Sequence, residues 1–192
     1  MIYIGKLKTR DLILCGMFAS LIAIGAFIRI PVPFVPFTLQ FLFTNLAGLI
    51  LGKKLGALSV DVYILVGLLG LPVFTAGGGL GYIFYPTFGY LIGFRFGAYL
   101  AGYLVEKMNA NSFKAYFLAS LSNIVVVYIF GVVYYYFIAN YYLNSPIAAS
   151  VLLLHGLILC IPGDILICIW SASLMKRLKP IVFRGEGYYA DK

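Results

Sequence analysis

The feature that most constrains this chain is a series of long apolar runs that contain almost no charge. Residues 115–138, for example, contain no Asp, Glu, Lys or Arg. Only 10% of the 192 residues are charged, whereas a soluble globular domain carries about 25%. So few charges cannot solvate the surface of a water-soluble protein of this size. The sequence therefore predicts a protein embedded in a lipid bilayer, and it excludes a soluble enzyme, a disordered chain and a disulfide scaffold.

Six apolar runs are candidate membrane crossings, since one crossing takes about 20 apolar residues. They are residues 12–28, 38–51, 55–71, 87–105, 115–138 and 147–175. The second run is short for a crossing, and Pro162 interrupts the last one. We interpret the first run as a true span, because it lacks the cleavage site of a signal peptide. The predicted fold is all-α, a single membrane domain made of a bundle of six transmembrane helices with non-helical outer loops.

The basic residues alternate between the two sides of this arrangement. Twelve of the 14 lie before the first span, between spans two and three, between spans four and five, or after the sixth. Of the other two, Arg29 lies in an opposite connection and Arg95 lies within the fourth span. Short connections rich in Lys and Arg stay cytoplasmic, so we expect a plasma-membrane protein with both termini in the cytoplasm. Basic residues scattered in twos and threes also argue against nucleic-acid binding.

Two connections on the predicted outer side are apolar but cannot be helical. The first, residues 30–40, contains Pro31, Pro33 and Pro36, and each proline lacks an N–H and restricts the backbone before it. The second, residues 71–82, has four glycines in five residues. Apolar non-helical backbone in a membrane protein must be buried or line a cavity. Both segments could close over a small ligand, or the glycine-rich one could be a tight turn that serves packing alone.

Three ionisable residues lie inside the predicted spans, where each costs at least about 2.5 kcal/mol. Asp164 follows the helix-breaking Pro162 in the sixth span. Arg95 lies about 12 Å from the outer end of the fourth span by helical rise, whereas Asp61 lies nearer the cytoplasmic end of the third. Different depths argue against an ion pair between Arg95 and Asp61. Arg95 and Asp164 lie at similar depth, and they either form a structural ion pair or point into a cavity.

These polar residues predict a site for a small, mostly apolar ligand with a few hydrogen-bonding groups. Neutral polar side chains collect near the outer halves of the spans. The candidate ligand-binding residues are Thr38, Gln40, Gly79, Tyr85, Tyr90, Arg95, Asn123 and Asp164. The sequence shows neither an acidic cluster for a metal nor a nucleophile–base constellation, so we expect no metal site and no enzymatic activity.

Small residues recur at a spacing of four in several spans. Gly89, Gly93 and Gly97 do so in the fourth span, and Ala19 and Ala23 do so in the first. Such stripes let helices pack closely in lipid, and we interpret most of them as packing inside the bundle. A contact with another subunit is the alternative. It fits Ala19 and Ala23 best, because the first span has the fewest polar residues to bury.

At these residues the sequence resembles the BioY family, the biotin-specific substrate-binding subunits of energy-coupling-factor (ECF) transporters. The resemblance covers nearly the whole chain, and it rests on the order and spacing of short motifs that are individually weak. These motifs are Ile30-Pro31-Val32-Pro33, Pro36-Phe37-Thr38-Leu39-Gln40, Ala47-Gly48, Gly56-Ala57-Leu58-Ser59, Gly70-Leu71-Pro72-Val73-Phe74, Pro86-Thr87, Gly89-Tyr90-Leu91, Gly93-Phe94 and Pro162-Gly163-Asp164.

The resemblance implies six membrane helices, cytoplasmic termini and high-affinity capture of biotin from the outer side without catalysis. It implies partners as well: a transmembrane coupling subunit, which would contact Ala19 and Ala23, and two cytoplasmic ATPase subunits. Asp164 matches a binding position of the family and would accept hydrogen bonds from the ureido N–H groups of biotin. We expect Asn123 to form hydrogen bonds with the same ureido group. Biotin is the substrate, and no cofactor is implied.

The chain also departs from the family pattern. Relatives often carry Lys three residues after the Asp, where this chain has Ile167. Arg95 as partner of the biotin carboxylate is our own inference, and Gln40 or backbone N–H groups of the glycine-rich segment are the alternatives. Two other functions stay open. One is a proton-coupled secondary transporter with Asp61 and Asp164 as its relay, although no inverted repeat is visible. The other is a membrane assembly subunit without a small ligand.

Overall fold

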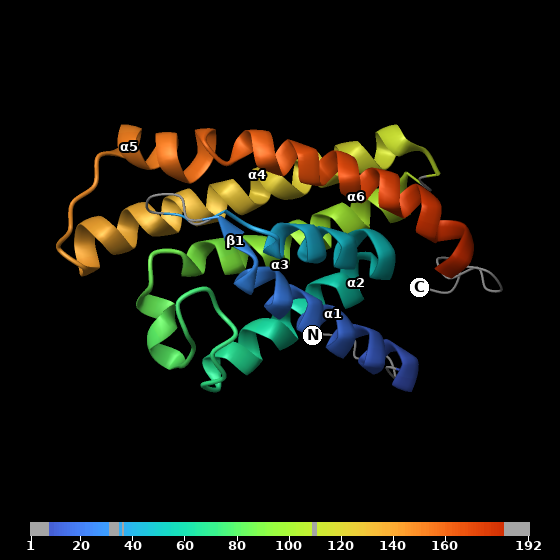
Figure 1. The fold of residues 1–192 in the computed structure, drawn as a ribbon, viewed down its shortest axis with the longest axis horizontal. Coiled ribbons are helices and arrows are strands. Elements are labelled where there is room, and N and C mark those ends of the chain that lie inside the picture. The colour runs from blue at the N-terminus through green and yellow to red at the C-terminus, as the bar shows by residue number, and fades with distance from the viewer. Residues whose placement is uncertain (1–7, 31–34, 36, 109–110, 183–192) are drawn as a thin grey trace.

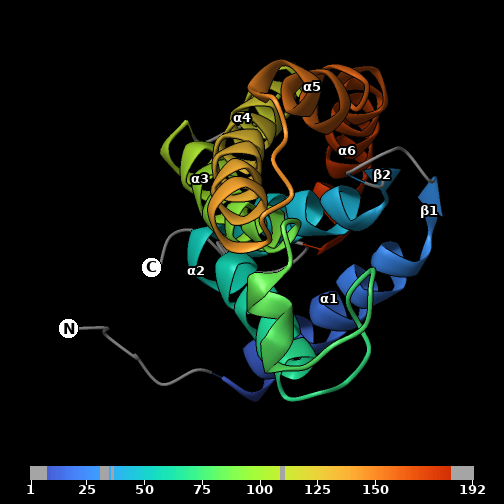
Figure 2. The same ribbon diagram turned by 90° about the vertical axis from the view of Figure 1, so that its left-hand side faces the viewer.

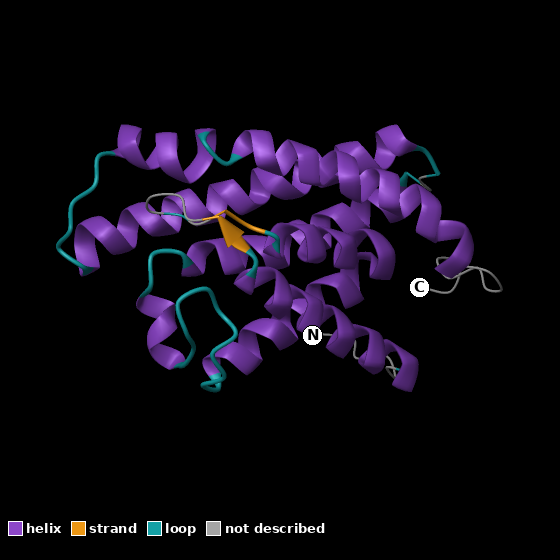
Figure 3. Cartoon of the chain, viewed as in Figure 1, coloured by secondary structure: helices purple, strands orange, loops and turns teal. Residues whose placement is uncertain are grey.

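The structure is a bundle of apolar helices with one very short pair of strands (Figure 3). It is a computed structural model, and it describes residues 8–30, 35, 37–108 and 111–182. Pro31, Pro33 and Pro36 lie outside these ranges. The predicted closure of the proline-rich connection over a ligand therefore rests on its described neighbours alone.

The first helix and the second are joined through a short hairpin. Helix α1 (Thr9–Phe27) leads into strand β1 (Arg29–Ile30), which pairs antiparallel with strand β2 (Phe37–Thr38). In this register Arg29 lies opposite Thr38. The hairpin brings the end of α1 back to the start of the next helix, and it holds β2 close to the bundle (Figure 2).

Helix α2 (Gln40–Leu68) is divided by a sharp kink at Gly52, which has φ 81° and ψ −179°. Glycine adopts this positive φ without the steric cost that a side chain would bring. The two halves of α2 run in different directions (Figure 2). At the kink, Glu106 accepts a hydrogen bond from the backbone N–H of Lys53 at 2.9 Å and forms an ion pair with its ammonium group at 2.7 Å. This carboxylate therefore caps the second half of α2.

The rest of the chain forms long helical stretches joined by short connections. The elements are η1 (Leu80–Phe84), α3 (Phe88–Lys107), α4 (Phe113–Phe137), η2 (Ile138–Tyr142), α5 (Ala149–Leu153), η3 (Leu154–Ile158) and α6 (Ile161–Val182). The segments η2 and η3 are single π-helical turns. Together α5, η3 and α6 form one stretch that runs along α4 (Figure 1). Pro162 is the second residue of α6, where the missing N–H costs no helical hydrogen bond.

Four of the described helical stretches are long and apolar enough to cross a membrane. They are Thr9–Phe27, Phe88–Lys107, Phe113–Tyr142 and Ala149–Leu178. The prediction of a helical, multi-pass membrane protein is confirmed to this extent. The predicted spans 38–51 and 55–71 correspond to the two halves of α2, which carry Lys53, Lys54 and Asp61.

The glycine stripe of α3 packs against α4. A Cβ atom placed on Gly93 would lie 2.8 Å from Cα and 2.9 Å from the carbonyl oxygen of Val127. A Cβ on Gly97 would meet the side chain of Asn123 in the same way. Only glycine lets the two backbones approach this closely. The interpretation of this stripe as packing inside the bundle is therefore confirmed.

The small-residue stripe of α1 is largely covered by the chain itself. Ala19 is buried in the core, and Ala23 is half-buried. The exposed small residues of this helix are instead Gly16 and Ser20. A coupling subunit at this helix would therefore meet Ala23 and its exposed neighbours more readily than Ala19.

Candidate ligand-binding site

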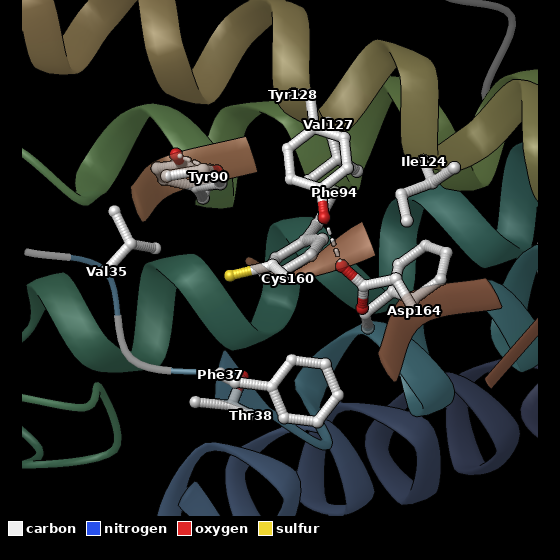
Figure 4. A pocket seen from close by; sticks show the side chains of 12 residues that line it. Val35, Phe37, Thr38, Tyr90, Phe94, Ile124, Val127, Tyr128, Cys160 and Asp164 are labelled. Carbon is white, nitrogen blue, oxygen red and sulfur yellow. Dashed lines mark hydrogen bonds between the residues drawn. The ribbon is translucent and has the colours of Figure 1, made fainter. Parts of the chain in front are cut away.

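A cavity of about 50 Å³ lies between the hairpin, α3, α4 and the last helical stretch. This volume is smaller than the range of about 300–1,000 Å³ that is usual for small-molecule sites, so a ligand of biotin's size needs the surrounding side chains to move apart. Figure 4 shows the lining side chains converging on the cavity. They are Val35, Phe37, Thr38, Phe41, Tyr90, Phe94, Ile124, Val127, Tyr128, Gly156, Cys160 and Asp164. Most of the lining is apolar or aromatic, with a few polar groups at defined places.

Asp164 supplies the charged group of the cavity. It lies in the first turn of α6 and is only 7% exposed. Tyr128 donates a hydrogen bond from its hydroxyl group to Oδ2 of this carboxylate at 2.5 Å (Figure 4). Among the described residues, none donates a hydrogen bond to the second oxygen, Oδ1. One carboxylate oxygen is therefore anchored, and the other is left for a ligand.

The side of α4 that faces the cavity follows from helical spacing. Ile124, Val127 and Tyr128 stand at positions i, i+3 and i+4, so they share one face of the helix. The close approach of α3 at Gly93 fixes how this face is turned. Tyr128 was not among the site residues predicted from the sequence. The available signal was that a tyrosine in mid-span needs a hydrogen-bond partner for its hydroxyl group.

A second tyrosine ties α3 to the π-helical turn η3. The hydroxyl group of Tyr90 donates to the carbonyl oxygen of Gly156 at 3.0 Å. A Cβ on Gly156 would lie 2.9 Å from that hydroxyl oxygen, so glycine makes room for this contact. Single π-turns inside helices are frequent at functional sites. Here the turn brings a backbone carbonyl and Cys160 to the cavity wall.

Strand β2 and the residue Val35 before it form one wall of the cavity. Val35, Phe37 and Thr38 line the cavity, and the ring of Phe37 packs against Gly163 at the start of α6. A Cβ on that glycine would lie 2.7 Å from the ring. The described end of the proline-rich connection therefore does contribute to the cavity wall.

Three of the eight predicted site residues line this cavity: Thr38, Tyr90 and Asp164. The other five do not belong to its described lining. They are Gln40, Gly79, Tyr85, Arg95 and Asn123. The structure shows what each of these five contacts instead.

Gln40 joins the two ends of α2. Its side-chain N–H donates to the hydroxyl oxygen of Tyr63 at 2.7 Å. The hydroxyl group of Tyr63 in turn donates to the carbonyl oxygen of Val73 at 3.0 Å. Gln40 thus holds the connection after α2 in place, and it is buried in doing so.

The glycine-rich segment packs around its own aromatic core. Phe74 is 1% exposed, and its ring lies 5.5 Å from that of Tyr63 and 4.5 Å from that of Tyr82. Gly79, at φ 99°, donates from its backbone N–H to the carbonyl oxygen of Gly67 at 2.7 Å. Since the described cavity lining includes no residue of this segment, the structure favours packing over contact with a ligand.

Tyr85 lies at the surface of the same connection. Its ring stacks on that of Tyr82 at 5.1 Å, and nearly half of the residue is exposed. The side chain does not belong to the described cavity lining, so its contribution is to the outer surface of the loop.

Arg95 and Asp61 form an ion pair, so the expectation that different depths keep them apart is wrong. Nε of Arg95 donates to Oδ1 of Asp61 at 2.8 Å. The reason is that α2 ends at Leu68, which puts each residue seven positions from the outer end of its helix, about 10 Å by helical rise. Their side chains are 41% and 36% exposed. Arg95 therefore faces outward, and the ion pair considered between Arg95 and Asp164 is not formed.

Asn123 belongs to a buried polar network between α2 and α4. Its side-chain N–H donates to Oδ1 of Asn45 at 3.0 Å, and Asn45 donates to Oγ of Ser120 at 2.8 Å. Ser120 donates to the backbone carbonyl of Tyr116 at 2.9 Å. The network joins helices rather than reaching the cavity, and it satisfies the side-chain N–H of Asn123 but leaves Oδ1 of Asn123 buried without a donor among the described residues.

A helical membrane bundle with a single anchored carboxylate in a small apolar cavity defines a membrane protein that binds a small solute. Residues 3–184 match the BioY family. The chain belongs to the BioY family.

Similar proteins support this assignment. The probable biotin transporter BioY of Lysinibacillus sphaericus is 44% identical over 178 residues, which cover 93% of this chain and 90% of that protein. The biotin transporter BioY of Thermotoga maritima is 43% identical over 71% of this chain and 78% of that protein. A crystal structure of the S-component for biotin from an ECF-type ABC transporter superposes with a TM-score of 0.67. The two chains are 28% identical, and the match covers 88% of this chain and 90% of that one.

Proposed function

We propose that this protein is the biotin-binding membrane subunit of an ECF-type vitamin uptake transporter, a transport protein rather than an enzyme. The observation that carries the proposal is the carboxylate of Asp164. It lies in a largely apolar cavity, and its Oδ1 lacks a donor among the described residues. A buried charge is costly unless hydrogen bonds compensate it. The ureido N–H groups of biotin supply such bonds.

The rest of the lining suits the rest of biotin. Phe37, Phe94, Ile124 and Val127 offer apolar surface for the fused rings and the aliphatic chain. Thr38 lies on the hairpin side, away from Asp164 (Figure 4). Its hydroxyl group is the donor that we assign to the valerate carboxylate. Arg95 does not take this role, because it pairs with Asp61.

The charge pattern and the fold support a definite topology. Counting the two halves of α2 separately yields a single domain of six crossings. The start of α1, the kink of α2, the connection from α3 to α4 and the end of α6 lie toward one end of the bundle (Figure 1). Nine described basic residues belong to these four places, and three more precede or follow them in the sequence, which makes 12 of the 14. That end is cytoplasmic by the positive-inside rule. Both termini then lie on the cytoplasmic side of the plasma membrane.

Inward delivery depends on an ECF module. A transmembrane coupling subunit and two cytoplasmic ATPase subunits are the partners that we assign, with α1 as the helix that contacts the coupling subunit. Ala23 and the exposed Gly16 and Ser20 would let a partner helix approach closely.

The arrangement of the acidic residues does not favour a proton-coupled transporter. Asp61 pairs with Arg95, and Asp164 is bound by Tyr128. Within the described part of the chain, no chain of hydrogen-bonded side chains links the two carboxylates. The relay that such a mechanism needs therefore has no support in the bundle.

Calorimetric titration of the detergent-purified protein with a panel of vitamins tests the proposal. We expect saturable binding of biotin at micromolar concentration or below, and no heat of binding from the others. Absence of biotin binding would overturn the proposal and favour an assembly subunit. Tighter binding of another vitamin would overturn the assignment of biotin.

Replacing Asn123 by Ala should destabilise the protein without weakening biotin binding. The change leaves Oδ1 of Asn45 buried without its donor, which costs about 1–3 kcal/mol of unfolding free energy. Because Asn123 is not part of the cavity lining, the dissociation constant for biotin should stay within about threefold of the wild type, less than about 0.7 kcal/mol. Thermal unfolding and titration of the same sample measure both effects. A large loss of affinity in a folded variant would show that Asn123 does contribute to the binding site.

A further inference from the structure

We propose that Tyr128 is the positioning residue of the ligand site. Its hydroxyl group turns the Asp164 carboxylate so that Oδ1 faces the ligand, and it makes this end of the cavity selective for ligands that present N–H donors. The inference rests on the proposed function, because it assigns a role inside the same cavity.

The hydrogen bond between Tyr128 and Asp164 joins two different helices. Both residues are less than one-tenth exposed, and the two oxygens lie 2.5 Å apart. The terminal torsion of an aspartate side chain has broad, weakly restricted wells. Without an anchor the carboxylate would therefore rotate. Because Tyr128 is its described donor, this one bond sets the direction of Oδ1.

The donors at this end of the cavity are all committed to acceptors within the protein. Tyr128 donates to Asp164, Tyr90 donates to the carbonyl oxygen of Gly156, and the thiol of Cys160 points to the carbonyl oxygen of His155 at 3.7 Å. Each hydroxyl group has one hydrogen to donate. What these lining groups offer to a ligand is therefore lone pairs alone.

An acceptor-only surface discriminates by chemistry rather than by size. A ligand with an N–H group can donate to Oδ1 of Asp164, whose other oxygen is already bound by Tyr128. A ligand with an oxygen atom in the same place would be repelled, because the lone pairs of that oxygen face those of the carboxylate. The buried charge of Asp164 would then lack a hydrogen-bond donor. Sites built to hydrogen-bond a polar group reject analogues that lack it far more strongly than they reject a change in apolar bulk.

The position of Tyr128 is held by helix packing. It follows Val127, whose backbone lies directly against Gly93 of α3. A well-packed neighbour restricts the rotation of α4 about its axis, so the phenol group reaches Asp164 in a single geometry. The role of Tyr128 is thus positional, acting on the ligand mainly through another side chain.

Tyr128→Phe tests the inference, with Tyr135→Phe as the matched control on the same helix. Tyr135 is also buried but does not belong to the described cavity lining. The probes are biotin and two carbamate analogues, in each of which an oxygen atom replaces one ureido N–H. We expect Tyr128→Phe to weaken biotin binding about tenfold, because the Asp164 carboxylate is no longer held in the orientation that presents Oδ1 to the ligand. The analogues should be affected much less, so the preference for biotin falls. Tyr135→Phe should leave the preference unchanged.

The outcomes separate this inference from the proposed function. If the wild type fails to bind biotin, the proposed function is wrong and this inference falls with it. If the wild type binds biotin but Tyr128→Phe keeps the full preference over the analogues, only the positioning role is wrong. The wild type alone provides a second test that does not depend on folding of the variant. It should bind at least one analogue at least about tenfold more weakly than biotin, and equal binding of all three would overturn the inference.

Discussion

Asp164→Asn weakens biotin binding by more than about tenfold, which corresponds to about 1.4 kcal/mol. The carboxylate accepts from Tyr128 through Oδ2 and keeps Oδ1 for the ligand. An asparagine of the same shape loses the charge and replaces one acceptor oxygen by an NH₂ donor. Either Tyr128 or the ureido group then meets a donor instead of an acceptor, and charge-assisted hydrogen bonds are about twice as strong as neutral ones. Calorimetric titration of the purified variant measures the loss.

Asp61→Asn is the matched control for this prediction. It makes the same chemical change in another helix, at a residue whose partner is Arg95 rather than a cavity group. We expect lower thermal stability with the biotin dissociation constant within about threefold of the wild type. Unchanged affinity in Asp164→Asn would remove this residue from the site. Equal losses in both variants would instead favour a mechanism that couples the two carboxylates.

Gly93→Ala destabilises the bundle by about 1–3 kcal/mol, the usual cost of overpacking. The added Cβ would lie 2.8 Å from Cα and 2.9 Å from the carbonyl oxygen of Val127. Both are backbone atoms, so no flexible side chain can move aside and α3 and α4 must separate. Separation also shifts Tyr128, which follows Val127. We therefore expect a lower melting temperature in detergent together with weaker biotin binding.

Gly16→Ala controls for the intrinsic effect of the same substitution in a helix. Nothing lies within 4 Å of a Cβ at Gly16, which is on the exposed side of α1. Alanine has a higher helix propensity than glycine by about 1 kcal/mol, so the melting temperature should stay the same or rise. A Gly93→Ala variant as stable as this control would show that α3 and α4 can repack without cost.

The two helix pairs that form the cavity, α3 with α4 and α4 with α6, have different roles. Close packing of α3 on α4 fixes the orientation of the apolar wall, because glycine has no side chain that would keep the two backbones apart. The contact of α4 with α6 carries the polar recognition through Tyr128 and Asp164. Substitutions at Gly93 should therefore change stability and affinity together, whereas substitutions at Asp164 should change affinity more than they change stability.

The sequence by itself determined the class of protein and the outline of its topology. Long runs without charge predict membrane helices whatever their arrangement, because the cost of burying charge in lipid does not depend on which helices are neighbours. The alternation of basic residues is likewise a property of the connections. Asp164, Tyr90 and Thr38 were predicted as site residues, and all three line the cavity. Thr38 and Asp164 each follow a proline by two positions, which is unusual within such runs.

Only the tertiary structure decided which polar groups meet. Tyr128 and Asp164 are 36 positions apart, and Asn45 and Asn123 are 78 apart. Whether such pairs touch depends on the rotation of each helix about its axis and on where each helix ends. Asp61 and Arg95 each lie seven positions from the outer end of their helix, and there they form an ion pair in place of the predicted ligand contact of Arg95. Hydropathy records that a side chain is polar, but helix packing selects its partner.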